Sequence, residues 1–338
     1  MGHIPSAFPR SSAAQASADR RGLPLGGQSV REAGVTHPLS NTSFYVGRQE
    51  ADRVHHRGMG SLLAHASSEQ ALLDAWEDLR SAAQEDGPTS PEILDFESHA
   101  ARRIHAISVQ LRAGTWQPSP AHHVAIAKAA GGVRHLAVPP VEDRVVERAI
   151  LNVLDPVIDP LLMPWTYGYR RGLGVDDAIR ALIEARDSGY SCVLRADIQD
   201  CFAQIPRWPV IVRLREVCPD PELVEVVRSV IRRHVVGKDS PHATGGRGLH
   251  QGSPLAPLLA NIYLDGFDRE MASRGWQVIR FSDDFAVPAR DRAAAERCVG
   301  DAIAAAQAVN LQLNLGKTHS VSFDEGVAFL GRLDPNPR

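Results

Sequence analysis

The chain has 338 residues, a formal net charge of −3 at pH 7, 43% hydrophobic residues and 23% charged residues. These values indicate a soluble globular protein of about one to three domains, and no run of residues approaches the roughly 18 apolar residues of a membrane span. The four cysteines form no C-x-x-C pair, which argues against a zinc ribbon and a disulfide-stapled secreted scaffold and favours a cytoplasmic protein.

The first part of the chain is expected to be a tail followed by helices and one hairpin. Residues 1–65 are rich in Ser, Ala, Gly, Pro and Arg without sustained apolar periodicity, so we expect a disordered or poorly packed extension. The stretch 124–138 is typical of a β-hairpin around a Gly-Gly turn, and it carries Lys128 and Arg134. Helices are predicted on both sides of this hairpin, at about 67–86, 93–111, 143–154 and 175–186.

Strands alternate with helices in the second half of the chain. Ser191–Asp197 is a short apolar strand that ends on a carboxylate, and 278–281 and 285–287 flank Ser282-Asp283-Asp284 as the strands of a hairpin would. The remaining predicted elements are helices at about 207–233, 254–271 and 292–309 and strands near 311–323 and 327–330. This order predicts an α+β fold in which helices cover one face of an antiparallel sheet.

Three carboxylates form the candidate catalytic centre. Asp197 ends one predicted strand, and Asp283 and Asp284 lie at the tip of the predicted hairpin. If these strands are neighbours in one sheet, the three carboxylates converge on one edge and need cations to offset their repulsion. Two divalent metal ions about 3.5–4 Å apart would meet that need, and such a pair stabilises both the attacking and the leaving oxygen of a phosphoryl transfer.

Several motifs in the correct order between about 70 and 331 resemble those of the reverse transcriptases of the group II intron-like bacterial branch. The segment 196–202 resembles their first palm motif, 247–264 resembles their Q-G-x-x-x-S-P-L-L-A-N-x-Y-L helix, and 281–284 stands where they carry Y-A-D-D. Further similar segments are 128–134, 143–149, 167–170, 313–318 and 329–331. The resemblance implies a right-hand polymerase fold with N-terminal helices and fingers in 66–190, a palm in 191–331 and a short tail at 332–338.

The resemblance implies a metal centre at the three carboxylates. Asp197, Asp283 and Asp284 would hold two Mg²⁺ ions, with Mn²⁺ as an alternative, and the Ile198 carbonyl would be a further oxygen ligand. The chain would then be an RNA-directed DNA polymerase that uses an RNA template, a DNA or RNA primer and deoxynucleoside triphosphates.

Two of the few lysines fall on motif positions. Only three of the 37 basic residues are lysines, namely Lys128, Lys238 and Lys317, a bias that a GC-rich genome explains. By resemblance, Lys128 and Arg134 would grip the incoming triphosphate, and Lys317 would be the general acid that protonates the leaving pyrophosphate. A lysine can act as a proton donor, whereas an arginine does not lose its proton in a protein.

The resemblance also assigns residues around the nucleotide. Phe202 would be the steric gate that collides with a ribose 2′-OH, although an isolated phenylalanine is typical of a core. Gln251 and Gly252 would lie under the nucleotide and the template, just before a helix that Ser253 can cap and Pro254 can start.

Within the family, the segments 172–178, 186–190 and 322–331 are most similar to the CRISPR-associated enzymes. This likeness implies spacer acquisition from RNA together with a CRISPR integrase complex, a part of antiviral defence. Group II intron and retron-type enzymes are the alternatives within the family. Phe202 disfavours a viral-type RNA-dependent RNA polymerase.

Two further expectations concern the duplex and the class of protein. Only seven residues follow Gly331, too few for the helical thumb that such polymerases place there, so we expect a missing thumb and a partner that supplies its grip. The competing class is a non-catalytic polymerase-fold scaffold that binds RNA, which the net charge of −3 favours because nucleic-acid binders are commonly basic. The three aspartates favour an enzyme.

Overall fold

The computed structural model describes residues 61–333 except 86, 128–131 and 238–245. Most of the expected tail at 1–65 therefore lies outside the described residues, but its last residues form helix α2 (Leu62–Ala66). Across the described ranges, no helix combines the length and apolar character needed to cross a membrane.

One aspartate joins α2 to a helix far along the chain. Asp220 accepts hydrogen bonds from Ser61 Oγ at 2.6 Å and from the Leu63 N–H at 2.8 Å. It is also the N-cap of α10, where it accepts from two backbone N–H groups of the first turn. The helices that precede the first strand are α2, α3 (Glu69–Glu85), α4 (Pro91–Ser98) and α5 (Ala100–Arg112).

The predicted hairpin is confirmed, and a third strand joins it. β1 (Ala121–Ala127) and β2 (Val133–Val138) pair antiparallel, with Ile126 opposite Arg134. β4 (Val235–Val236) lies parallel to β1 on its other side. β4 could not be predicted from the sequence, because a two-residue strand has no periodicity of its own and forms only where a neighbour supplies its hydrogen bonds.

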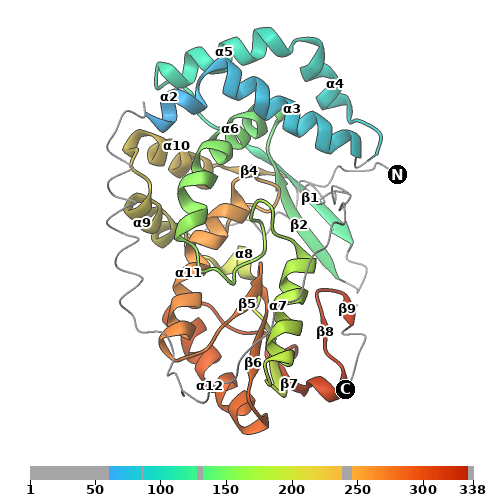
Figure 1. Cartoon of the computed structure of the whole chain (residues 1–338). Coiled ribbons are helices and arrows are strands. Elements are labelled where there is room, and N and C mark those ends of the chain that lie inside the picture. The colour runs from blue at the N-terminus through green and yellow to red at the C-terminus, as the bar shows by residue number, and fades with distance from the viewer. Residues whose placement is uncertain (1–60, 86, 128–131, 238–245, 334–338) are drawn as a thin grey trace, which may run out of the picture. The chain divides into compact units, whose positions relative to one another are not determined.

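The second sheet has four antiparallel strands in the order β5-β6-β3-β7. Successive residues of a strand point to opposite faces, and here both faces are covered by helices. Leu194 packs into the large core with α11 and α12, whereas Val193 packs into a smaller cluster with α7 (Figure 1). The α+β class is therefore confirmed, but the prediction of helices on one face only is wrong. The strands of this sheet are β3 (Cys192–Asp197), β5 (Ile279–Phe281), β6 (Asp284–Ala289) and β7 (His319–Ser322).

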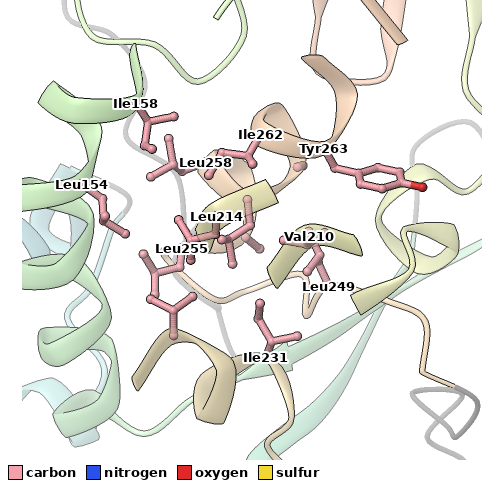
Figure 2. Packing of buried hydrophobic residues seen from close by; sticks show 14 of the residues in the cluster. Leu154, Ile158, Val210, Leu214, Ile231, Leu249, Leu255, Leu258, Ile262 and Tyr263 are labelled. Carbon is pink, nitrogen blue, oxygen red and sulfur yellow. The ribbon is translucent and has the colours of Figure 1, made fainter. Parts of the chain in front are cut away.

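The large hydrophobic core packs several helices against one another and against the second sheet. Leu154 and Ile158 of α6 lie in one cluster with Leu214 of α9 and with Leu258 of α11, all of them buried (Figure 2). All four cysteines are buried free thiols, as expected for small apolar side chains. The helices that follow the hairpin are α6 (Val141–Ile158), α7 (Val175–Asp187), α8 (Cys201–Gln204), α9 (Arg207–Val217), α10 (Pro221–Ile231), α11 (Ala256–Ser273) and α12 (Arg292–Ala308).

Three predicted elements are interrupted in the structure. The helical region predicted at 207–233 is two helices, α9 and α10, separated by residues 218–220. The helix predicted at 93–111 is two helices, because His99 leaves helical geometry with φ −131° and ψ 17°. The strand predicted at 311–323 is a strand only over β7, and 314–317 forms a turn closed by the hydrogen bond from the Lys317 N–H to the Asn314 carbonyl. A last two-stranded sheet consists of β8 (Ala328–Phe329) and β9 (Arg332–Leu333).

Candidate active site

The three aspartates meet at one edge of the second sheet. Asp197 is the last residue of β3 and pairs in register with Asp284, the first residue of β6. The Ile198 N–H donates to the Asp283 carbonyl at 2.9 Å, which holds Asp283 beside the end of β3. The predicted convergence follows from this antiparallel register, because the end of one strand lies opposite the start of the other.

Lys317 reaches the same edge from the turn before β7. The Asn314 N–H donates to the Asp197 carbonyl at 2.8 Å, so this turn lies against the end of β3. Lys317 Nζ then lies 3.2 Å from Asp197 Oδ2 in an exposed ion pair. The lysine assigned to proton transfer is therefore adjacent to the carboxylates.

Burial makes the aspartate pair electrostatically unfavourable. It is the main cause that raises the pKa of Asp283, and the charge of Asp197 adds to the rise. Burial also raises the pKa of Asp284, opposed first by Arg195, whose Nη2 lies 3.5 Å from Asp284 Oδ1. Positive charge at this edge favours the ionised form of the carboxylates.

The donor set fits hard divalent cations, which prefer carboxylate and carbonyl oxygens. The positions of the side chains, however, do not form a metal site. Within the described ranges, no group of three or more His, Cys, Asp or Glu side chains is placed to hold a metal ion. Lys317 and Arg195 supply the neighbouring positive charge instead. The carboxylates thus have the right chemistry for metal ions, while the side-chain positions are those of an ion-paired site.

Phe202 lies on α8, one turn beyond the end of β3, with 7% of its surface exposed. Its ring meets the Tyr169 ring edge-on, with centroids 6.4 Å apart and planes at 85°. Burial raises the pKa of the Tyr169 hydroxyl, the charge of Asp283 adds to the rise, and Arg134 opposes it. Tyr169 is therefore close enough to be influenced by the charges of both Asp283 and Arg134 of β2.

Gln251 and Gly252 lie against strand β2. The Gln251 carbonyl accepts a hydrogen bond from the Ala137 N–H at 2.7 Å. Gly252 has φ +115°, and a Cβ there would lie 2.8 Å from the Ala137 carbonyl oxygen. A side chain at 252 would therefore be both strained and obstructed, so only glycine fits this approach.

The predicted cap of α11 is wrong. The helix begins at Ala256, two residues later than a Ser253 cap and a Pro254 start would place it, and its N-cap Leu255 has no capping side chain. Ser253 Oγ instead donates a hydrogen bond to the buried carboxylate of Glu147. Ser253 Oγ also accepts a hydrogen bond from the Leu255 N–H at 3.3 Å, but Leu255 precedes the first turn, so the serine lies outside the helix that it was expected to cap.

Glu147 belongs to a buried charge network behind this loop. Arg233 Nη2 lies 2.7 Å from Glu147 Oε1 and 3.5 Å from Asp143 Oδ2. Burial is the main cause that raises the pKa of Asp143 to about 6, although Arg233 opposes the rise. The network joins α6 to the segment between α10 and β4 and, through Ser253, to the Gln251-Gly252 loop.

A second buried network supports the aspartate turn, and sequence reasoning missed it. Arg280 and Asp268 are both fully buried, and Arg280 donates from Nε and Nη2 to the Asp268 carboxylate. Arg280 Nη1 also donates to the Ser282 carbonyl and to Asn261 Oδ1, at 3.0 Å each. The available signal was an arginine inside the apolar run 278–281, two residues before the turn.

Of the two residues predicted to bind the triphosphate, the structure describes only one. Arg134 lies on β2 and is exposed, whereas Lys128 lies outside the described residues. The structure therefore brings together Asp197, Asp283, Asp284, Lys317, Ile198 and Phe202, and it places Gln251 and Gly252 against β2, the strand that carries Arg134.

Comparison with protein families gives one match over most of the described chain. Residues 126–332 match the family described as "Reverse transcriptase (RNA-dependent DNA polymerase)". Protein YkfC of Escherichia coli K12 is 25% identical over 278 residues, which are 70% of this chain and 72% of that protein. The group II intron-encoded protein LtrA of Lactococcus lactis is 26% identical over 54% of this chain and 31% of its own length.

Comparison with solved structures gives two neighbours of different identity. A chain of a "Partial Cas6-RT-Cas1--Cas2 complex" is 30% identical with a TM-score of 0.45, over 69% of this chain and 39% of that chain. Telomerase from Candida albicans, in a complex with a telomeric RNA fragment, matches with a TM-score of 0.50 and 16% identity, over 64% of this chain and 44% of its own. The telomerase likeness shows a shared fold alone.

Proposed function

Because this chain belongs to the reverse transcriptase (RNA-dependent DNA polymerase) family, we propose that it adds deoxynucleotides to a primer 3′ end under the direction of an RNA template. The observation that carries the proposal is the meeting of Asp197, Asp284 and Asp283 at one sheet edge with Lys317 beside them. Such an arrangement suits phosphoryl transfer, in which charge develops on the attacking and leaving oxygens.

The family generally uses divalent metal ions, and the carboxylates are the groups that would hold them. Two Mg²⁺ ions held by Asp197, Asp283 and Asp284, with the Ile198 carbonyl as a further ligand, would stabilise the attacking and leaving oxygens. Mn²⁺ would be accepted by the same oxygen ligands. Arg195 and Lys317 balance the charge of these carboxylates from either side.

The remaining residues bind the nucleotide and move one proton. Arg134 and Lys128 would bind the triphosphate from the fingers hairpin, and Phe202 would exclude a ribose 2′-OH. The primer 3′ hydroxyl gives its proton to water, its oxygen forms a bond to the α-phosphorus, the bond from that phosphorus to the bridging oxygen breaks, and pyrophosphate leaves with its electron pair. Lys317 Nζ would give the leaving oxygen its proton.

Primer extension with the full chain tests the enzyme directly. The assay uses an RNA template, an annealed DNA primer, dNTPs and Mg²⁺ or Mn²⁺. We expect synthesis by the parent and loss of at least about a thousandfold in Asp283→Ala and Asp284→Ala, because each removes a ligand of the centre. Asp176→Ala is the control, since its side chain is 80% exposed on α7.

Each other outcome contradicts a definite part of the proposal. Absence of synthesis by the parent with either metal ion, together with binding of RNA, would favour the non-catalytic scaffold. Synthesis that survives both substitutions would place the reaction elsewhere. Phe202→Ala should admit ribonucleotides, and unchanged selectivity in that variant would remove Phe202 from the gate.

For the biological setting, we propose RNA-derived spacer acquisition with a CRISPR integrase complex, on the similarity of 172–178, 186–190 and 322–331 to CRISPR-associated enzymes. A group II intron-type role is the second candidate, which the similarity to LtrA favours. The fingers and palm boundaries at 66–190 and 191–331 belong to the same proposal.

Primer extension with and without a purified integrase complex separates the settings. A longer product per binding event with the integrase is expected if the integrase contributes to the grip on the duplex. No effect of the integrase, with stimulation by a structured intron RNA, would contradict the CRISPR setting in favour of the intron. Both results leave the polymerase proposal itself intact.

A further inference from the structure

Tyr169 has a backbone conformation that tyrosine rarely adopts. Its φ is +59°, in the left-handed region, where a residue with a Cβ pays a steric cost. Residues held in such conformations cluster at functional sites, where the surrounding structure over-determines them. The question for Tyr169 is which contacts hold it there and what its ring does.

The chain on both sides of Tyr169 is fixed by buried groups. The Gly168 carbonyl accepts a hydrogen bond from Asn261 Nδ2 at 2.8 Å. A Cβ at Gly168 would lie 2.4 Å from the Ser282 backbone nitrogen, so the 168 backbone lies directly against the aspartate turn. On the other side, Arg170 donates to the carboxylate of Asp159 at 2.6 and 2.9 Å.

The same turn is tied to the Arg280 network described above. The Tyr167 N–H donates to the Arg280 carbonyl at 2.8 Å, and the Arg280 N–H donates to the Trp165 carbonyl at 3.1 Å. Asn261 bonds both Gly168 and Arg280. The position of Tyr169 is thus set by the groups that also hold the turn of Asp283.

The Tyr169 ring connects the gate residue to this turn. Its edge-on contact with Phe202 is matched by a tilted contact with Phe281, also with centroids 6.4 Å apart. The Tyr169 hydroxyl lies 3.4 Å from Ser282 Oγ. Tyr169 is 37% exposed while Phe202 is 7% exposed, so the tyrosine is the more solvent-exposed of the two residues.

We propose that Tyr169 is a positioning residue for sugar selection, whose ring edge holds Phe202 in the orientation that excludes a ribose 2′-OH. This inference rests on the proposed function, because it assumes that Phe202 contacts the sugar. An aromatic ring has few conformations, and a neighbouring ring in edge-to-face contact favours one of them. Without Tyr169, Phe202 is free to turn away from the sugar.

The test measures the ratio of kcat/KM for a dNTP to that for the matching rNTP, in primer extension by the full chain. We expect Tyr169→Ala to lower this ratio about three- to tenfold, the range that corresponds to loss of one aromatic pair contact. Tyr169→Phe keeps the ring and should keep the ratio within about twofold. Tyr169→Gly removes the ring without the left-handed cost, so it should match Tyr169→Ala if the ring is responsible.

A double-mutant cycle shows whether Tyr169 acts through Phe202. In a Phe202→Ala background, Tyr169→Ala should have little further effect on the ratio, because the group that it positions is gone. Trp208→Ala is the control for the loss of an exposed aromatic ring, since Trp208 is 58% exposed and contacts Arg215. The ratio of kcat/KM for dNTP to that for rNTP in Trp208→Ala should equal that of the parent.

The outcomes separate this inference from the proposed function. A parent that makes DNA, with a Tyr169→Ala ratio equal to its own, overturns the role of Tyr169 and leaves the polymerase standing. Fully additive effects in the cycle, or a loss of selectivity in Tyr169→Phe as large as in Tyr169→Ala, also overturn it. A parent without template-directed synthesis overturns the proposed function first. A melting temperature for each variant identifies any that fails to fold, and Tyr169→Phe, which differs from the parent by one hydroxyl, then remains informative.

Discussion

Arg280 and Asp268 form an ion pair with Nη2 2.7 Å from Oδ2, and both side chains are completely removed from solvent. Each side chain of the pair also makes a hydrogen bond to a further group. Thr166 Oγ1 donates to Asp268 at 2.9 Å, and Arg280 Nη1 donates to the Ser282 carbonyl. A buried pair of this kind is weak support for stability by itself, but removal of one partner leaves an uncompensated charge.

Arg280→Met is therefore expected to lower the free energy of unfolding by about 3–5 kcal/mol, because Asp268 stays buried without its cation. The double variant Arg280→Met with Asp268→Leu should regain most of this stability and little of the DNA synthesis, since the Ser282 carbonyl still lacks its donor. Chemical denaturation and primer extension on the same preparations measure both. Arg292→Met is the control, because its pair with Glu296 is exposed and should contribute less than about 1 kcal/mol. Full recovery of synthesis in the double variant would contradict a role for Arg280 in holding the turn.

Substitutions of Lys317 distinguish the electrostatic effect of its charge from its proposed role as a proton donor. Lys317→Arg keeps a cation beside Asp197 but cannot readily give up a proton, and Lys317→Ala loses both. If Lys317 is the general acid, both variants should slow single-turnover incorporation by about 10²- to 10⁴-fold. Rapid-quench measurement at saturating dNTP gives this rate. A Lys317→Arg rate equal to that of the parent would reduce the role of Lys317 to electrostatics.

Gly252→Ala should disturb the contact between the Gln251-Gly252 loop and β2. The new Cβ would meet the Ala137 carbonyl oxygen at 2.8 Å, and φ +115° is unfavourable for alanine. We expect a stability loss of about 1–3 kcal/mol and a higher KM for dNTP. Gly275→Ala is the matched control, since Gly275 also has a positive φ, +85°, but no heavy atom lies within 4 Å of its Cβ position. Equal behaviour of the two variants in thermal melts and in KM would show that the close approach to β2 is unimportant.

The raised pKa of Asp143 predicts a pH dependence of stability. Burial raises this pKa to about 6 in the folded chain, whereas an unfolded aspartate has a pKa of about 3.9. Between these values the folded state binds more protons than the unfolded state, so stability falls as pH rises from about 4 to about 6 and is then constant. The loss attributable to Asp143 is on the order of 3 kcal/mol.

Asp143→Asn should flatten this part of the profile. Urea unfolding at several pH values from about 4.5 to 7.5 measures it, with Asp176→Asn as the exposed control. Identical pH dependence in the parent and in Asp143→Asn would show that Asp143 titrates near its ordinary pKa.

The parts of the site that could be predicted from the sequence are those that a local pattern of residues indicates. Asp197 follows an apolar strand and the aspartate pair follows another, so their meeting required only that the two strands be neighbours, which the structure confirms. The helix α11 begins two residues later than predicted, and the bond from Ser253 to Glu147 was not foreseen because Glu147 lies 106 positions away. The partners of Arg280 were missed for the same reason, since Thr166 lies 114 positions from it. Local patterns predict elements, whereas long-range polar partners are decided by packing.

The separation of Asp197 and Lys317 by 120 positions has a consequence during synthesis of the protein. A ribosome adds about 5–20 residues per second, so roughly ten seconds pass between the appearance of the aspartate and that of the lysine. Closing loops of this length costs chain entropy before the contacts compensate for it. The local hairpins therefore form first, and the nascent chain has its strands and helices in place before it has a complete catalytic edge. The last part of this edge to be synthesised is therefore the residue proposed to move the proton.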